Sequence, residues 1–292
     1  MSATGAIYDR GYRPYEGPRG GRRAAVLALW RASVRRALGL RRSWRQKLFP
    51  WALLVIATVP AIVNVGVAYL TRDTSAADIE FITYRDYVGI STALLVFVAL
   101  TAPDVLCPDR RQRVLPVIFA RPLTGADYVW AKFSAIASIV FAFGFLPHVV
   151  LFVGQMLVSD AALTYLGDNA DVLWKVPASV AIVAVYYAAI GLAAAALTDR
   201  RIVAAAGLLT FTLVSSAVAG IFTSGGDSSP VALANLLGLP LYLRDLVFLG
   251  HISIESALSG VEGGGSLAVL TYVVVVGGCL AILLRRYRWI ER

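Results

Sequence analysis

Six long apolar runs constrain the fold of this 292-residue chain more than any other feature of its sequence. About 20 helical residues, rising about 1.5 Å each, cross the roughly 30 Å hydrocarbon core of a bilayer. In lipid every backbone polar group must bond within its own segment, so apolar runs of this length predict helices. The sequence therefore predicts an all-α membrane protein with six transmembrane helices. The expected spans are 49–70, 87–106, 131–158, 172–197, 202–222 and 265–284.

Charge is scarce in the chain and unevenly distributed. Only 15% of the residues are charged and 58% are hydrophobic, whereas soluble domains carry about 25% charge. The net charge of +9 could suggest nucleic acid, but 23 of the 27 Lys and Arg residues lie in the N-terminal segment, in 107–132, in 199–201 and in the C-terminal tail. This asymmetry predicts that both termini and the segment 107–132 are cytoplasmic, with the membrane and not nucleic acid as the partner of the basic charge.

The chain before the first span divides into two parts. Residues 1–23 are rich in Gly, Pro and Tyr and predict an irregular cytoplasmic segment. Residues 24–48 predict an amphipathic elbow helix in the headgroup plane of the membrane. This helix is either a membrane anchor alone or an anchor that also contacts a cytoplasmic partner. Its apolar face is formed by Val26, Trp30, Ala37, Trp44 and Leu48.

The segment 107–130, between the second and third spans, is short, basic and rich in helix-breaking residues. Pro103 and Pro108 are expected to end the second span. Thr124 is expected to cap the third long helix, with Asp127 as its reciprocal partner in a capping box. The apolar residues between these points predict a short helix. It either projects from the protein as a hydrophobic knob or folds back against the other helices.

This segment, DRRQRVLPVIFARPLTGADYVWAK, resembles a connection in the ABC-2 type transporter permease family. There the second and third transmembrane helices are joined by E-R-x-x-G-T-L-x-x-L-L-S-R-P-V-S-R-x-x-Y-V-x-G-K. The chain departs at Arg113 and Val114, which replace Gly-Thr, and at Ala131, which replaces Gly. The elbow helix, the six spans and the long insertion before the last span also resemble the family's layout. The matching positions are Asp109, Arg110, Leu115, Arg121, Pro122, Thr124, Tyr128 and Lys132.

The resemblance implies that 49–292 form the transmembrane domain of a dimeric ABC exporter in a prokaryotic inner or plasma membrane. The second permease subunit would be identical or different. ATP and Mg would bind to a separate cytoplasmic ATPase subunit, and this chain would hold no cofactor. The short helix of the segment 107–130 would dock on that ATPase as a coupling helix. The residues assigned to ATPase coupling are Asp109, Arg110, Arg113, Leu115, Phe119, Arg121 and Pro122.

The lysines independently predict that the chain does not hydrolyse ATP by the P-loop route. A P-loop requires Gly-x-x-x-x-Gly-Lys-Ser/Thr, so that backbone amides and the Lys bind phosphate. Lys47, Lys132 and Lys175 follow Gln, Ala and Trp, and none fits. The chain is therefore expected to be a transport subunit without catalytic residues. Its two Cys and two His residues predict neither a disulfide nor a metal site.

Polar residues inside the spans are candidates for a transport pathway, because such residues are costly in lipid and often functional. The alternative is that each is satisfied by a backbone carbonyl or a neighbouring helix. No Asp or Glu falls at the middle of a span, which disfavours an ion-coupled secondary carrier. A membrane scaffold without transport is the other alternative. The candidate pathway residues are Asn64, His148, Gln155, Ser215 and Ser216.

The insertion 223–264, expected on the external side, is long for a structureless loop. Its apolar part, 231–250, is interrupted by Pro240, Arg244 and Asp245 and is therefore not expected to be a seventh span. It predicts two short helices that are either re-entrant or lie on the surface. The fourth and fifth spans are rich in Ala and Gly, which predicts close packing of these two helices against each other.

Overall fold

The computed structural model describes residues 17, 20–40, 44–72, 83–87, 91–159, 161–223 and 228–291, and within these it contains helices and no strands. Six helices are long and apolar enough to cross a membrane, so the predicted fold class is confirmed and the chain is a multi-pass membrane protein. The spanning helices are α2 (Trp44–Thr71), α4 (Ser91–Arg111), α6 (Gly125–Val158), α8 (Val172–Leu197), α9 (Arg201–Thr223) and α11 (Gly264–Glu291). The shorter elements are α1 (Arg22–Ala37), α3 (Tyr84–Tyr87), α5 (Leu115–Phe119), α7 (Ala162–Asp168), the 3-10 helix η1 (Pro230–Ala234) and α10 (Leu239–Leu249).

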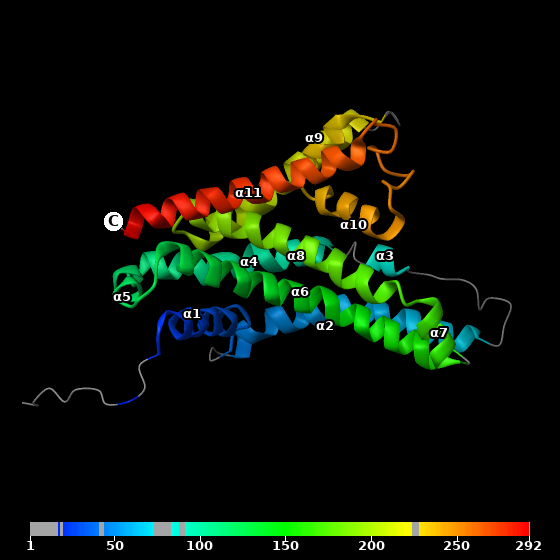
Figure 1. Cartoon of the computed structure of the whole chain (residues 1–292), viewed down its shortest axis with the longest axis horizontal. Coiled ribbons are helices and arrows are strands. Elements are labelled where there is room, and N and C mark those ends of the chain that lie inside the picture. Colours follow the sequence, from blue (N-terminus) through cyan, green and yellow to red (C-terminus); the bar gives the residue numbers. More distant parts are fainter. Residues whose placement is uncertain are drawn as a thin grey trace, which may run out of the picture.

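The long helices run side by side in an elongated bundle (Figure 1). One end carries α5, α1 and the last turns of α11, and is called the α5 end. The opposite end carries α3, α7 and α10, and is called the α10 end. The centre of the bundle is formed by α4 and α8, which are 69% and 72% buried over their most apolar windows, whereas α2, α9 and α11 are at most 22% buried. The outer helices therefore present most of the apolar surface to lipid.

Close packing between α4 and α8 depends on a glycine. A Cβ atom added to Gly191 would lie 2.2 Å from Cγ1 of Val98. Ala188, Ala195 and Ala196 are fully buried on the same helix. The small residues of the fourth span therefore pack closely against the second span. α8 also packs against α9, the fifth span, although a Cβ on Gly207 of α9 would meet nothing within 4 Å, so this glycine does not lie at a close helix contact.

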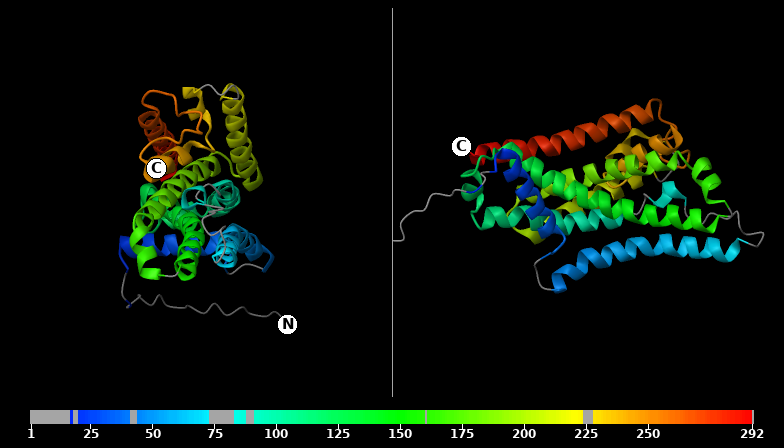
Figure 2. Two further views of the ribbon diagram at one scale, coloured as in Figure 1. Left: turned by 90° about the vertical axis from the view of Figure 1, so that its right-hand side faces the viewer. Right: turned by 60° about the horizontal axis from the view of Figure 1, so that its bottom comes forward.

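The amphipathic helix before the first span is shorter than expected. α1 ends at Ala37 and not near residue 48, because the next turn contains Gly39 at φ 66°, a left-handed conformation that terminates helices. Trp44 and Leu48 instead belong to α2. Figure 2 shows α1 lying across the bundle, and it packs against α6 and α4. Most of the expected irregular segment 1–23 lies outside the described residues.

The second span continues past its prolines. Pro103 and Pro108 lie inside α4, so the expectation that they end it is wrong. Tertiary contacts hold these last turns: the Cys107 Sγ lies 3.5 Å from the Thr198 carbonyl oxygen, and Arg110 donates to the Ala196 carbonyl at 2.6 Å. The predicted capping box of Thr124 and Asp127 at the start of α6 is confirmed.

The insertion before the last span folds as η1 followed by α10. Arg244 and Asp245 are buried on α10 and bonded to each other, with Arg244 Nη2 2.6 Å from Asp245 Oδ1. Arg244 also donates to the Arg85 carbonyl oxygen at 3.1 Å, which ties α10 to α3. The charges that argued against a seventh span are therefore neutralised inside the α10 end. Whether α10 enters the membrane stays a prediction.

Gly191→Ala should destabilise the protein, because overpacking a tight core typically costs about 1–3 kcal/mol. Thermal unfolding in detergent, followed by tryptophan fluorescence, measures the change. The matched control is Gly207→Ala, whose added methyl group meets open space and should leave the unfolding midpoint nearly unchanged. Equal midpoints for the two variants would contradict the close approach of α4 and α8.

Candidate functional site

A buried carboxylate joins three helices at the α5 end. Asp109, 3% exposed near the end of α4, lies 2.6 Å from Nη1 of Arg36 on α1. Its other oxygen lies 2.7 Å from Nζ of Lys132 and accepts from the Tyr128 hydroxyl at 2.9 Å, both on α6. These four residues are called the Asp109 junction. They fix the amphipathic helix and the two long helices that flank α5 in one arrangement.

The Asp109 junction places nearly all its polar groups in contact with a partner. Lys132 is 3% exposed, and its ammonium also donates to the Val105 carbonyl oxygen at 3.1 Å. The Tyr128 ring packs against Tyr287 of α11, with centroids 4.9 Å apart. A buried ion pair holds only when further hydrogen bonds offset the desolvation of both charges. The junction meets this condition, and it also brings the last turns of α11 to the same point.

A second polar contact fixes α4 to the turn between α8 and α9. Arg110 Nη2 lies 2.7 Å from the Asp199 carboxylate, in addition to its bond to the α8 carbonyl. Arg201, the first residue of α9, pairs with Asp104 at 2.5 Å. The end of α4 is therefore bonded to α1, α6, α8 and α9.

A third contact joins the start of α1 to the start of α6. Arg22 donates to both oxygens of Asp127 at 2.8 Å. The same carboxylate accepts from the backbone of Thr124 at 3.0 Å in the capping box. Asp127 therefore caps α6 and holds α1, a role that its capping position alone does not reveal.

The short helix α5 has one buried and one exposed face. Leu115 is buried, and Phe119 is half-buried with its ring 6.1 Å from that of Tyr128. Pro116 and Val117 face outward, and Val117 is 68% exposed. The two alternatives for this segment, a helix that projects from the protein and a helix that folds back against it, are therefore each partly correct. One face folds back, and the other projects from the bundle.

The seven residues assigned to coupling separate into two groups. Arg113, Arg121 and Pro122 are exposed around α5. The other four make contacts inside the protein. Asp109 and Arg110 form the ion pairs of α4, and Leu115 and Phe119 lie on the inner face of α5. Sequence reasoning missed the exposed Val117. Helical geometry offered a signal for it, because residues 115 and 119 share a face and residue 117 lies on the opposite one.

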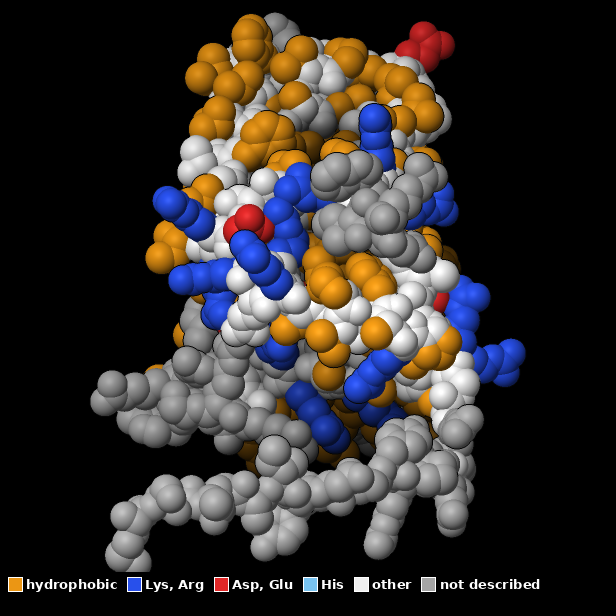
Figure 3. Space-filling model, turned by 90° about the vertical axis from the view of Figure 1, so that its left-hand side faces the viewer, with side chains coloured by type: hydrophobic (Ala, Val, Ile, Leu, Met, Phe, Trp, Pro, Cys, Tyr) orange, Lys and Arg blue, Asp and Glu red, His pale blue; other side chains and the backbone are white. Residues whose placement is uncertain are grey.

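Basic side chains surround the exposed face of α5. Figure 3 views the molecule from the α5 end and shows Lys and Arg side chains spread over this face, with hydrophobic side chains among them. Among the described residues, the exposed arginines of this end are Arg22, Arg23, Arg31, Arg35, Arg111, Arg113, Arg121, Arg200, Arg201, Arg285 and Arg288.

The candidate pathway residues do not share one site within the chain. Asn64 on α2 and His148 on α6 are buried, and Gln155, also on α6, accepts from the hydroxyls of Tyr84 and Tyr165 at 2.7 Å. Ser215 and Ser216 lie on α9, which packs against α4, α8 and η1. The structure brings together the α2 and α6 residues, since these helices pack on each other, but not the α9 pair.

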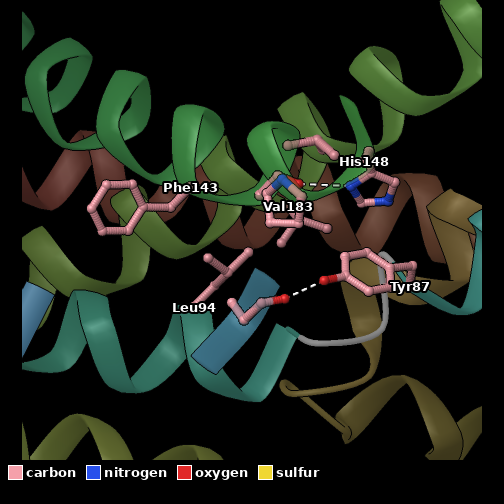
Figure 4. Close-up of a pocket in the computed structure, with 9 residues that line it drawn as sticks. Tyr87, Leu94, Phe143, His148 and Val183 are labelled. Carbon is pink, nitrogen blue, oxygen red and sulfur yellow. Dashed lines mark hydrogen bonds between the residues drawn. The ribbon is translucent and has the colours of Figure 1, made fainter. Parts of the chain in front are cut away.

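His148 borders a small cavity of about 20 Å³ (Figure 4). Its Nδ1 is 2.7 Å from the Gly144 carbonyl oxygen, one turn earlier in α6. The ring lies edge-on to Tyr87, with centroids 5.0 Å apart. A cavity of this size holds about one water molecule, whereas ligand pockets are roughly 300–1,000 Å³. The backbone carbonyl satisfies Nδ1, whereas Nε2 is buried and has no hydrogen-bond partner among the described residues.

The comparisons with known proteins assign no family. No protein-family model and no curated protein matches the chain. Among the described residues there is no cluster of His, Cys, Asp and Glu that could hold a metal ion. Cys107 and Cys279 are free thiols.

Asp109→Asn should destabilise the protein by about 3–5 kcal/mol, because it leaves the buried Lys132 ammonium without its counter-ion. The double variant Asp109→Asn/Lys132→Met should recover part of this loss, since the buried charge is then also removed. Chemical unfolding in mixed micelles measures both free energies.

The control for this cycle is Arg22→Gln, which breaks an ion pair whose arginine is 61% exposed and should change stability little. A double variant that is no more stable than Asp109→Asn would contradict the energetic coupling of the two residues.

Proposed function

We propose that this chain is the permease subunit of an ATP-driven exporter of the ABC-2 type, working with a separate cytoplasmic ATPase. The observation that carries the proposal is the combination of exposure and rigidity at α5. Val117 and Pro116 project from the bundle, while Asp109 and Arg110 bond the preceding helix to α1, α6, α8 and the α8–α9 turn. A coupling element needs both properties, because it must receive a partner and transmit that partner's movement.

The charge distribution supports a cytoplasmic α5 end. Most of the described Lys and Arg residues lie there, the exceptions being Arg72, Arg85, Lys175 and Arg244, whereas Asp86, Asp168, Asp171, Glu255 and Glu262 lie at the α10 end. Excess Lys and Arg marks the cytoplasmic side of membrane proteins. In this orientation α5 faces the cytoplasm and α10 the exterior of a prokaryotic inner or plasma membrane.

The partners of the proposed exporter follow from what the chain offers. Its sequence has no P-loop, so ATP and Mg would bind to the ATPase. The outward faces of α2, α9 and α11 are apolar and provide surface for lipid and for a second permease subunit. The cargo pathway would form between the two permease subunits, in keeping with the absence of a substrate-sized cavity at His148.

Val117→Asp should release the ATPase without disturbing the fold, because the side chain is 68% exposed. A charge placed in an apolar contact at the centre of an interface should lower co-purification of the ATPase by roughly 30-fold or more. ATP turnover by the complex should lose its stimulation by the permease. Leu115 and Phe119 are poorer choices, since their substitution would disturb the packing against α6.

The matched control is Ile254→Asp, an equally apolar and exposed side chain near α10. It should leave co-purification unchanged. Retention of the ATPase by Val117→Asp would contradict the proposal that α5 docks on the ATPase. Cargo movement driven by an ion gradient without ATP would instead identify an ion-coupled carrier, and a bound partner without a nucleotide site would identify a scaffold.

Cysteine labelling tests the orientation. Gln112→Cys near α5 and Glu255→Cys beside α10 are both exposed positions. A membrane-impermeant maleimide added to intact cells should label Glu255→Cys and not Gln112→Cys, and permeabilised cells should show both. The unsubstituted chain, with Cys107 buried and Cys279 half-buried, gives the background. The opposite labelling pattern would overturn the topology.

A further inference from the structure

A long apolar groove lies between α8, α9 and α11. Its volume is about 640 Å³, and its lining is almost wholly apolar. It follows α9 from Val203 to Thr212 and α11 from Val274 to Ile282. Five small residues line it: Ala193, Ala194, Ala204, Gly207 and Gly278. A Cβ atom on either glycine would meet nothing within 4 Å, so these residues leave the groove open.

The groove matches one leaflet of a bilayer in length and position. Ten residues of α9 rise about 13 Å, close to half of the roughly 30 Å hydrocarbon core. On α8 and α9 the groove occupies the half nearer the α5 end, and on α11 it extends from the middle of the helix toward that end. Leu236, in the connection before α10, closes its inner end and is held there by the Tyr186 hydroxyl, which donates to its carbonyl oxygen at 2.9 Å.

Basic side chains stand at the open end of the groove. Arg285 lies three residues after Ile282 on α11 and therefore continues its groove-lining face, and Arg200 immediately precedes α9, four residues before the lining residue Ala204. Both are exposed and make no ion pair with another described residue.

We propose that this groove binds one anionic phospholipid of the leaflet at the α5 end. An acyl chain lies along the small residues of α8, α9 and α11, and the headgroup phosphate is bound by Arg200 and Arg285. The apolar lining suits an alkyl chain, and the two guanidinium groups suit a phosphodiester. The site does not depend on the proposed export function.

Charge favours a lipid over a helix of a second copy. A second copy in the same membrane orientation would bring its own basic α5 end beside Arg200 and Arg285, and like charges repel. An anionic headgroup instead neutralises both arginines.

Native mass spectrometry of the purified protein tests the site. The protein is delipidated and titrated with a phosphatidylglycerol or a phosphatidylcholine with the same acyl chains. The unsubstituted protein should retain one phosphatidylglycerol in preference to phosphatidylcholine. Gly207→Leu/Gly278→Leu, which fills the groove, should abolish this retention. Arg200→Gln/Arg285→Gln should weaken phosphatidylglycerol binding by roughly 30-fold and remove the preference.

The matched control is Gly277→Leu, which adds the same side chain beside Gly278 but outside the groove lining, also into open space. It should bind phosphatidylglycerol like the unsubstituted protein. Undiminished retention by Gly207→Leu/Gly278→Leu, or an equal loss in Gly277→Leu, would overturn the site. Equal affinity for both lipids would overturn the role of the arginines, and a cysteine crosslink between the groove residues of two copies would assign the groove to a subunit contact.

Discussion

The arrangement of the α5 end depends on the carboxylate of Asp109. It lies where α1, α4 and α6 meet, and each of its oxygens has a cationic partner from a different helix. Without those partners a buried charge would be prohibitively costly, and without the carboxylate Lys132 could not be 3% exposed. The interaction therefore selects a single relative position for the amphipathic helix and the long hairpin that carries α5. The exposed face of α5 has a defined orientation because its base is held in this way.

Much of the fold could be predicted from local pattern. The fourth span was placed at the bounds of α8, and the capping box at Thr124 was correct, since both follow from hydropathy or from residues three positions apart. Local pattern failed where a distant contact decides the outcome. Pro108 signals a helix end, yet α4 continues because the Ala196 carbonyl of α8 and the Thr198 carbonyl just after it bind its last residues. α1 ends before Gly39, whereas the apolar periodicity beyond this glycine predicts that the helix continues to residue 48.

The position of the candidate site in the chain could be predicted from the sequence, but the role of each of its residues could not. The segment between the second and third spans was identified from its charge and its likeness to a known connection. Sequence could not tell that Asp109 and Arg110 bond inward while Val117 faces outward, because the partners of the first two lie on helices far away in the chain. The groove between α8, α9 and α11 was equally inaccessible. Gly207 and Gly278 are 71 positions apart, and only the folded chain brings the surfaces of their helices together.

The glycine contact between α4 and α8 has a mechanical consequence. The Val98 side chain of α4 lies against the α8 backbone at Gly191, so the two helices cannot slide or rotate past each other without a steric clash. The two helices therefore form one rigid unit in the middle of the molecule. A conformational change of this protein then requires the peripheral helices to move relative to that unit, with α2 on one side and α9 and α11 on the other.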